Sequence, residues 1–186
     1  GLNDISATDP AKLDAARRCG ELAMQCLRND LKPRDVLTPT ALRNAARMVA
    51  ATAGSTNAVL HLLAIAHDAG VELALEDFEQ ASRHTPVIAD LKPGGRFTAV
   101  ELTAAGGTAA VARELRIAGM IDDSPTVTGL GLFDEIDGAP AAPAGQQVVR
   151  SAANPLKPRG GYSILYGNLA PEGCVLKLAG HGRLHH

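Results

Sequence analysis

The chain reads Gly54-Ser55-Thr56-Asn57-Ala58-Val59-Leu60-His61-Leu62 where a polar turn meets an apolar helix. Ser55 or Thr56 can cap this helix, and Gly70 can end it. Unpaired N–H groups at a helix start, together with the positive end of the helix dipole, favour a carboxylate or another anion. A capped helix start without a ligand explains the same residues equally well, so both interpretations stand.

The helix that follows this turn is apolar on nearly all sides, which predicts that it is buried. We interpret His61 within it as a hydrogen-bonded core histidine, in preference to a functional group. His67 lies six residues further on and points to a different helix face, so the two are poor joint metal ligands.

Working outward, apolar periodicity predicts helices over residues 10–30 and 38–54. A short acidic helix is predicted over residues 75–82, with Asp77 and Glu79 directed outward. An extended segment, 86–91, and a turn, 92–95, come next, followed by two short helices over residues 99–105 and 108–118.

The pattern changes after Thr126. Residues 129–145 are rich in Gly, Ala and Pro, which predicts a linker around one short helix. Short apolar runs then predict strands at residues 147–150, 162–166 and 174–178. Segment 146–186 carries five Lys or Arg against one acidic residue. We therefore expect two parts, residues 1–140 and 141–186, and the second is too small to be a stable β domain alone.

Composition excludes several classes of function. The net charge is −2 and aromatic residues are 3%, so neither a basic surface nor stacking platforms for nucleic acid are expected. Apolar runs fall well short of the roughly 18 residues of a membrane span. Three cysteines are too few for a disulfide scaffold and indicate a reducing compartment, the cytoplasm. The polar segment 1–10 does not resemble a signal peptide.

Residues outside the turn give weak signals for chemistry. Cys19 and Cys26 lie seven residues apart, which is not metal-ligand spacing, so we interpret them and Cys174 as buried small hydrophobes. No phosphate-binding glycine motif, nucleophile elbow or acid/base pair of carboxylates stands out, and the acidic residues are expected on solvated faces. Three histidines near the end of the sequence could bind a metal ion adventitiously, and we assign them no role in a site: His181, His185 and His186.

Five further motifs follow the turn in a fixed order. They are Asp90-Leu91-Lys92-Pro93-Gly94-Gly95, Ala105-Gly106-Gly107, Thr126-Val127-Thr128-Gly129, Leu165-Tyr166-Gly167-Asn168-Leu169-Ala170-Pro171 with Gly173, and Lys177 with Ala179-Gly180. Together with Gly54 to Leu62, they resemble the dihydroxy-acid dehydratase and phosphogluconate dehydratase family over nearly the whole chain. Ala58-Val59 and the 90–95 run resemble the dihydroxy-acid branch more closely. Ala53 departs from the family pattern, which has a second glycine there.

The resemblance implies an α/β fold: the helix-rich later part of an α/β/α N-terminal domain, followed by the first strands of a β-rich, barrel-like C-terminal domain. It implies a segment of a cytoplasmic hydro-lyase that converts 2,3-dihydroxy acids to 2-keto acids in branched-chain amino acid biosynthesis. Family enzymes use an iron–sulfur cluster, a magnesium ion and a catalytic serine. The motifs that supply these groups are missing from this sequence, so we assign no catalytic or metal-binding residue and expect the chain alone to be inactive and cofactor-free.

Two alternatives remain open. The parent enzyme could act on a sugar acid such as a phosphogluconate or an aldonate, or the chain could be a non-catalytic module that pairs with a separate cluster-bearing chain. In the complete enzyme, we expect a homo-oligomer that binds a small dihydroxy acid and neither nucleic acid nor membrane. Ser55, Thr56 and Asn57, with His61 as a weaker candidate, are expected near the substrate because they stand at a helix N-terminus.

Overall fold

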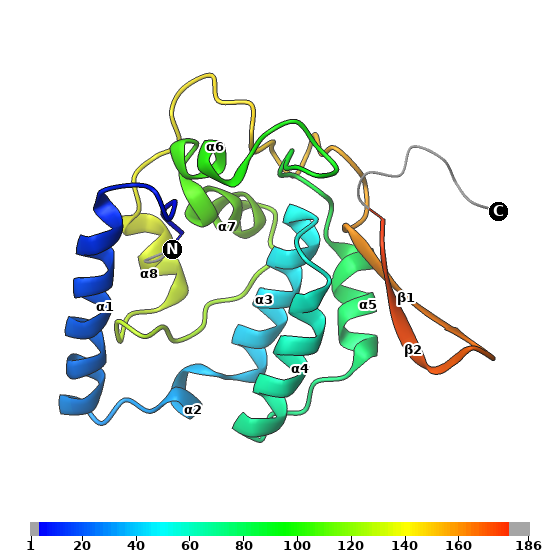
Figure 1. Ribbon diagram of the computed structural model, residues 1–186, viewed down its shortest axis with the longest axis horizontal. Coiled ribbons are helices and arrows are strands. Elements are labelled where there is room, and N and C mark those ends of the chain that lie inside the picture. Colours follow the sequence, from blue (N-terminus) through cyan, green and yellow to red (C-terminus); the bar gives the residue numbers. More distant parts are fainter. Residues whose placement is uncertain (1–3, 179–186) are drawn as a thin grey trace.

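The computed structural model of the chain describes residues 4–178 (Figure 1). These residues form eight helices followed by two antiparallel strands, which confirms the predicted α/β class with helices first. The elements are α1 (Ala11–Arg28), α2 (Pro33–Val36), α3 (Pro39–Thr52), α4 (Asn57–Ala69), α5 (Leu75–His84), α6 (Ala99–Ala104), α7 (Gly107–Ile117), α8 (Leu132–Gly138), β1 (Tyr162–Gly167) and β2 (Ala170–Lys177).

Local chemistry explains where α3 begins and ends. The Thr38 hydroxyl accepts a hydrogen bond from the Ala41 N–H at 3.2 Å, and Pro39 occupies the first helical position, where its missing N–H has no cost. Ala53 ends the helix in the left-handed conformation, with φ 47° and ψ 44°. This conformation turns the chain sharply, so that α4 can run back beside α3.

Helix α3 is the centre of the packing and contacts α4, α5 and α7 (Figure 1). One apolar cluster joins α3, α4, α5 and β1, and includes Phe78 and Tyr162, whose ring centroids lie 6.5 Å apart. A second cluster lies around α7 and contains the fully buried Ile88 and Leu115. These aliphatic and alanine-rich contacts replace the aromatic core that the composition lacks.

The predicted extended segment 86–91 contributes Ile88 and Ala89 to the second cluster. Val87 pairs with Lys157, and Ala89 pairs with Val149, each through an isolated antiparallel bridge. The prediction of a regular strand over residues 147–150 is therefore wrong. The Gln146 side chain accepts hydrogen bonds from the N–H groups of Val148 and Val149, and these contacts replace a continuous ladder.

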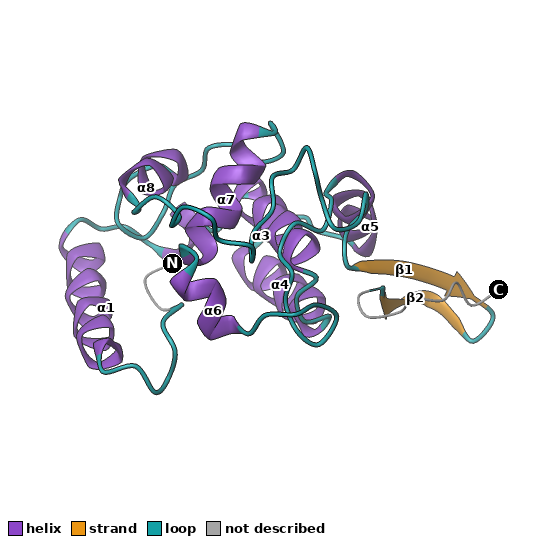
Figure 2. Ribbon diagram, turned by 90° about the horizontal axis from the view of Figure 1, so that it is seen from above, coloured by secondary structure: helices purple, strands orange, loops and turns teal. Residues whose placement is uncertain are grey.

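The hairpin of β1 and β2 lies at the edge of the molecule opposite α1 (Figures 1 and 2). The first half of β1 is buried and its second half is exposed, so β1 packs on the helices through its first half. Leu169 at the tip is 95% exposed. Strand β2 begins four residues before the predicted segment, because its ladder extends to the pair of Gly167 and Ala170.

Helix α4 is not buried as the sequence predicted. Val59 and Ala66 are its buried residues, whereas Leu60 is 65% exposed and Ile65 is 39% exposed. The reason is that α4 packs against α3 on one side, and no other described helix or strand makes a comparably extensive contact with it. The apolar composition of α4 does not reveal whether neighbouring elements cover one face of the helix or two.

The left-handed Ala53 generates a stability prediction. An alanine in this conformation is strained, so Ala53→Gly should raise the free energy of unfolding of the chain by about 0.5–1 kcal/mol, after the entropic cost of glycine. The matched control is Gly70→Ala. Gly70 ends α4 at φ 73° with open space around it, so alanine should lower stability by about 1 kcal/mol. Urea unfolding measures the free energy of unfolding of both variants. Equal changes of the same sign would contradict the strain assigned to Ala53.

Candidate functional site

The turn between α3 and α4 brings Ser55, Thr56 and Asn57 together at the N-terminal end of α4. The Gly54 N–H donates to the Val49 carbonyl at 3.0 Å, which closes the turn. The Ser55 hydroxyl accepts from the Asn57 N–H at 3.2 Å. Thr56 occupies the N-cap position, and in the described part of the chain its side chain makes no capping hydrogen bond. Ser55 and Asn57 are exposed, so they can meet a molecule from outside.

His61 lies one helical turn beyond Asn57 and is exposed, so the interpretation of a core histidine is wrong. Residues four apart share a helix face, which places His61 beside Asn57 on α4. The uncovered side of α4 explains the difference from the prediction. His67 is also exposed and approaches the Asp68 carboxylate at 3.5 Å, away from the turn.

The three cysteines do not form a site. Cys19 on α1 and Cys174 on β2 are exposed, so their predicted burial is wrong, while Cys26 is partly buried and donates to the Val127 carbonyl at 3.2 Å. Helix α1 lies at one edge and buries only Ala15, which explains the exposure of Cys19 (Figure 2).

The metal donors between residues 4 and 178 do not fit a cluster or a magnesium site. Among residues 4–178, no three His, Cys, Asp or Glu side chains come close enough to hold an ion. His181, His185 and His186 lie outside the described residues.

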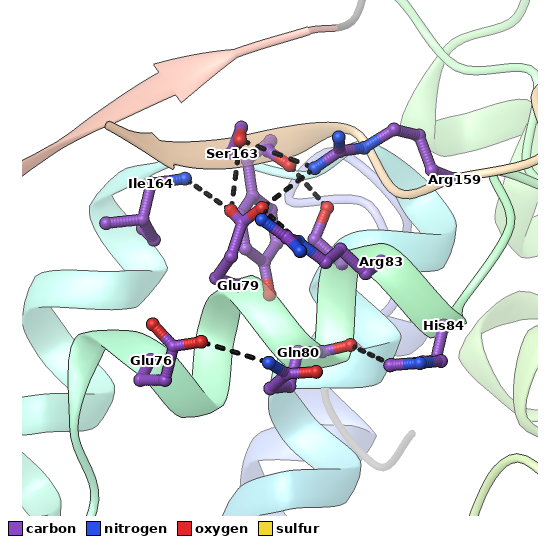
Figure 3. A network of polar contacts seen from close by, with 10 residues as sticks. Glu76, Glu79, Gln80, Arg83, His84, Arg159, Ser163 and Ile164 are labelled. Atoms are coloured by element: carbon purple, nitrogen blue, oxygen red, sulfur yellow. Dashed lines mark hydrogen bonds and ion pairs between the residues drawn. The ribbon is translucent and has the colours of Figure 1, made fainter. Parts of the chain in front are cut away.

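Glu79 forms the most extensive polar network (Figure 3). Its carboxylate accepts from the Arg83 Nε at 2.8 Å, the Arg159 guanidinium at 3.2 Å, the Ser163 hydroxyl at 3.0 Å and the Ile164 N–H at 2.6 Å. The Glu79 side chain is 5% exposed, so its predicted outward direction is wrong, whereas Asp77 is exposed as predicted. Glu79 shares a helix face with the buried Ser82, three residues further on, and this spacing was the signal in the sequence.

Electrostatics explain how α5 holds this carboxylate charged. Burial by itself raises the pKa of Glu79, but the hydrogen bonds from Arg83, Ile164 and Ser163 and the charge of Arg159 together outweigh it and lower the pKa to about 2. Burial, with a smaller contribution from the Glu79 charge, raises the pKa of Tyr162. Its hydroxyl donates to the Ala46 carbonyl at 3.2 Å. Both groups are therefore structural.

A second buried carboxylate, Asp90, was also expected on a solvated face. Its carboxylate accepts hydrogen bonds from the backbone N–H and the guanidinium of Arg96. These bonds hold Asp90 beside the turn at residues 92–95. Glu79 is thus paired with Arg83 and Arg159, and Asp90 is paired with Arg96. The two carboxylates therefore do not form an acid/base couple with each other.

Comparison with known proteins identifies the class. The family model for the dihydroxy-acid/6-phosphogluconate dehydratase N-terminal region matches residues 1–135, and the C-terminal model matches residues 147–186. The chain belongs to this family of dehydratases.

Individual relatives carry a more specific name. The chain is 50% identical to the dihydroxy-acid dehydratase of Koribacter versatilis over 99% of its own length and 32% of that protein. It is 51% identical to a Thermus thermophilus enzyme of the same name over 98% of the chain and 33% of that protein. A chloroplastic Arabidopsis thaliana relative is 46% identical over 98% of the chain and 30% of its own length. The chain therefore spans about a third of these relatives.

The helices between residues 4 and 178 do not meet the requirements of a membrane span. None of them combines the necessary length and hydropathy.

The Glu79 network generates a prediction about acid stability. The folded pKa of about 2 lies below the ordinary 4.5, so the network stabilises the chain fully above pH 4.5, and this contribution is lost as the pH falls toward 2. Glu79→Gln should lower the free energy of unfolding at pH 7 by about 2 kcal/mol and remove this part of the pH dependence.

Glu76→Gln is the matched control on the same helix. Glu76 is exposed and accepts one hydrogen bond, from Gln80 at 3.0 Å, so its loss should change stability by less than about 0.5 kcal/mol. Chemical unfolding from pH 2 to pH 7 measures both variants. Equal curves for wild type and Glu79→Gln would contradict the structural role.

Proposed function

We propose that this chain is a segment of a hydro-lyase that converts 2,3-dihydroxy acids to 2-keto acids in branched-chain amino acid biosynthesis. The observation that carries the proposal is the identity of about one half to relatives named dihydroxy-acid dehydratase, spread over almost the whole chain. The family also includes 6-phosphogluconate dehydratases. The names of the matching relatives favour the dihydroxy-acid substrate over a sugar acid.

Within this function, we assign substrate binding to Ser55, Thr56 and Asn57. The exposed start of α4 lies at the positive end of the helix dipole, which suits the substrate carboxylate. The Thr56 hydroxyl and the Asn57 amide can hydrogen-bond the carboxylate or the hydroxyl groups of the acid. His61, on the same face of α4, is the next candidate.

The dehydration itself needs groups that we do not assign to this chain. Loss of the 3-hydroxyl requires a Lewis acid, and removal of the C2 proton requires a base. We propose that the iron–sulfur cluster and the magnesium ion of the family serve the complete enzyme. The cysteines and carboxylates described above do not fit either group, so the role of this chain is to bind and orient the acid.

The organisation of the complete enzyme also remains a proposal. We propose that residues 1–140 belong to the N-terminal domain and residues 141–186 to a linker and the start of the C-terminal domain. The two family matches, 1–135 and 147–186, support this division. We further propose a cytoplasmic homo-oligomer without nucleic-acid or membrane partners. The free cysteines support the cytoplasm, and the net charge of −2 supports the absence of a nucleic-acid partner.

The first functional prediction concerns the chain alone. Purified and supplied with reconstituted iron–sulfur cluster and magnesium, it should not convert 2,3-dihydroxyisovalerate to the 2-keto acid. An assay of 2-keto acid formation measures this, with the complete Thermus thermophilus relative as the positive control. Clear turnover by the chain would contradict its role as a segment.

The second functional prediction concerns Thr56. The substitution equivalent to Thr56→Ala in the complete Thermus thermophilus relative should lower kcat/KM about tenfold to a hundredfold, because a hydrogen bond to the acid is lost. Thermal unfolding should be unchanged within about 0.5 kcal/mol, because the Thr56 side chain provides no cap. The control is Thr40→Ala, near the opposite end of α3, which should leave kcat/KM unchanged. Unchanged kinetics at Thr56 would contradict the assigned site.

A further inference from the structure

The last residue of β2 reaches the turn that carries the candidate site. The Lys177 ammonium donates a hydrogen bond to the Gly54 carbonyl at 3.1 Å, across 123 positions in the sequence. Lys177 is half-buried, so water competes for its charge less than at an open surface. Gly54 immediately precedes Ser55, so this contact acts directly on the backbone that presents Ser55, Thr56 and Asn57.

The neighbouring backbone fits the same turn closely. The Gly161 N–H donates to the Ala50 carbonyl at 3.1 Å, and a Cβ at Gly161 would lie 2.4 Å from the Cα of Ala53. Only glycine fits that space. The Leu178 N–H then donates to the Gly161 carbonyl at 2.7 Å, which joins the end of β2 to this contact. The hairpin therefore holds the turn through backbone packing and through one charged side chain.

We propose that Lys177 is a positioning residue of the substrate site. Its ammonium fixes the Gly54 carbonyl and thereby sets the direction in which the start of α4 faces the substrate. This inference rests on the proposed function, in which Ser55, Thr56 and Asn57 bind the acid. It adds a residue from the other end of the chain, which itself need not touch the substrate.

Lys157 offers a matched control. Its ammonium donates to the Leu178 carbonyl at 3.1 Å, so it holds the same end of the hairpin by the same kind of bond. The hydrogen bond of the Lys157 ammonium reaches the residue that follows β2 and does not involve Gly54. A variant at Lys157 therefore removes one bond to the strand end, while the Leu178 N–H stays bonded to the Gly161 carbonyl and the Lys177 bond to the turn stays in place.

The first experiment measures the turn itself and does not depend on activity. In the 186-residue chain, Lys177→Met should increase amide hydrogen exchange in the segment 54–59 about tenfold, with little change in α5. Lys157→Met should leave segment 54–59 protected as in wild type. Unchanged exchange in Lys177→Met would overturn the inference while leaving the proposed function untouched.

The second experiment measures catalysis in the complete Thermus thermophilus relative. The equivalent of Lys177→Met should lower kcat/KM about tenfold or more. Lys177→Arg, which keeps a donor and its charge, should recover most of that loss, and Lys157→Met should match wild type. Faster exchange without any change in kcat or KM would overturn the positioning role. If instead Thr56→Ala has no effect while exchange behaves as expected, the proposed site fails and the anchoring of the turn by Lys177 stands.

Discussion

The buried carboxylate of Glu79 is the interaction on which the arrangement of the chain depends. It is charged and almost fully removed from water, so it is stable only where several donors converge. Those donors come from α5, from β1 and from the loop before β1. Because this network joins α5 to the buried half of β1, it fixes where the hairpin begins (Figure 3).

The position of the hairpin in turn fixes the candidate site. Once β1 is held on α5, β2 runs back antiparallel to it and delivers Lys177 to the turn between α3 and α4. Tyr162 and Gly161 bring the same hairpin onto the last turns of α3. The N-terminal part of the chain thus carries the proposed binding groups, and the C-terminal part supplies contacts to the turn that carries them, although more than a hundred residues separate the two.

Much of this arrangement follows from local sequence, and the rest follows from contacts that local patterns do not encode. Thr38 with Pro39 predicts the start of α3, and apolar periodicity predicts the helices and the hairpin strands. The exposure of α4 and of Cys19 depends on which neighbours are present, which composition does not reveal. The polar turn before an apolar helix predicts Ser55, Thr56 and Asn57 as candidates, because they stand at a helix N-terminus. The bond of Lys177 to Gly54 and the bonds of Glu79 to Arg159 and β1 could not be predicted, because these partners lie 80 or more residues away.

The central claim is that the start of α4 faces the substrate because the hairpin holds it there. The most direct measurement is a crystal structure of the complete Thermus thermophilus relative with a bound 2,3-dihydroxy acid. The account predicts that the residues equivalent to Ser55, Thr56 and Asn57 hydrogen-bond the acid, directly or through one water, with the equivalent of Lys177 on the Gly54 carbonyl. An acid bound with this turn outside contact distance would contradict the claim.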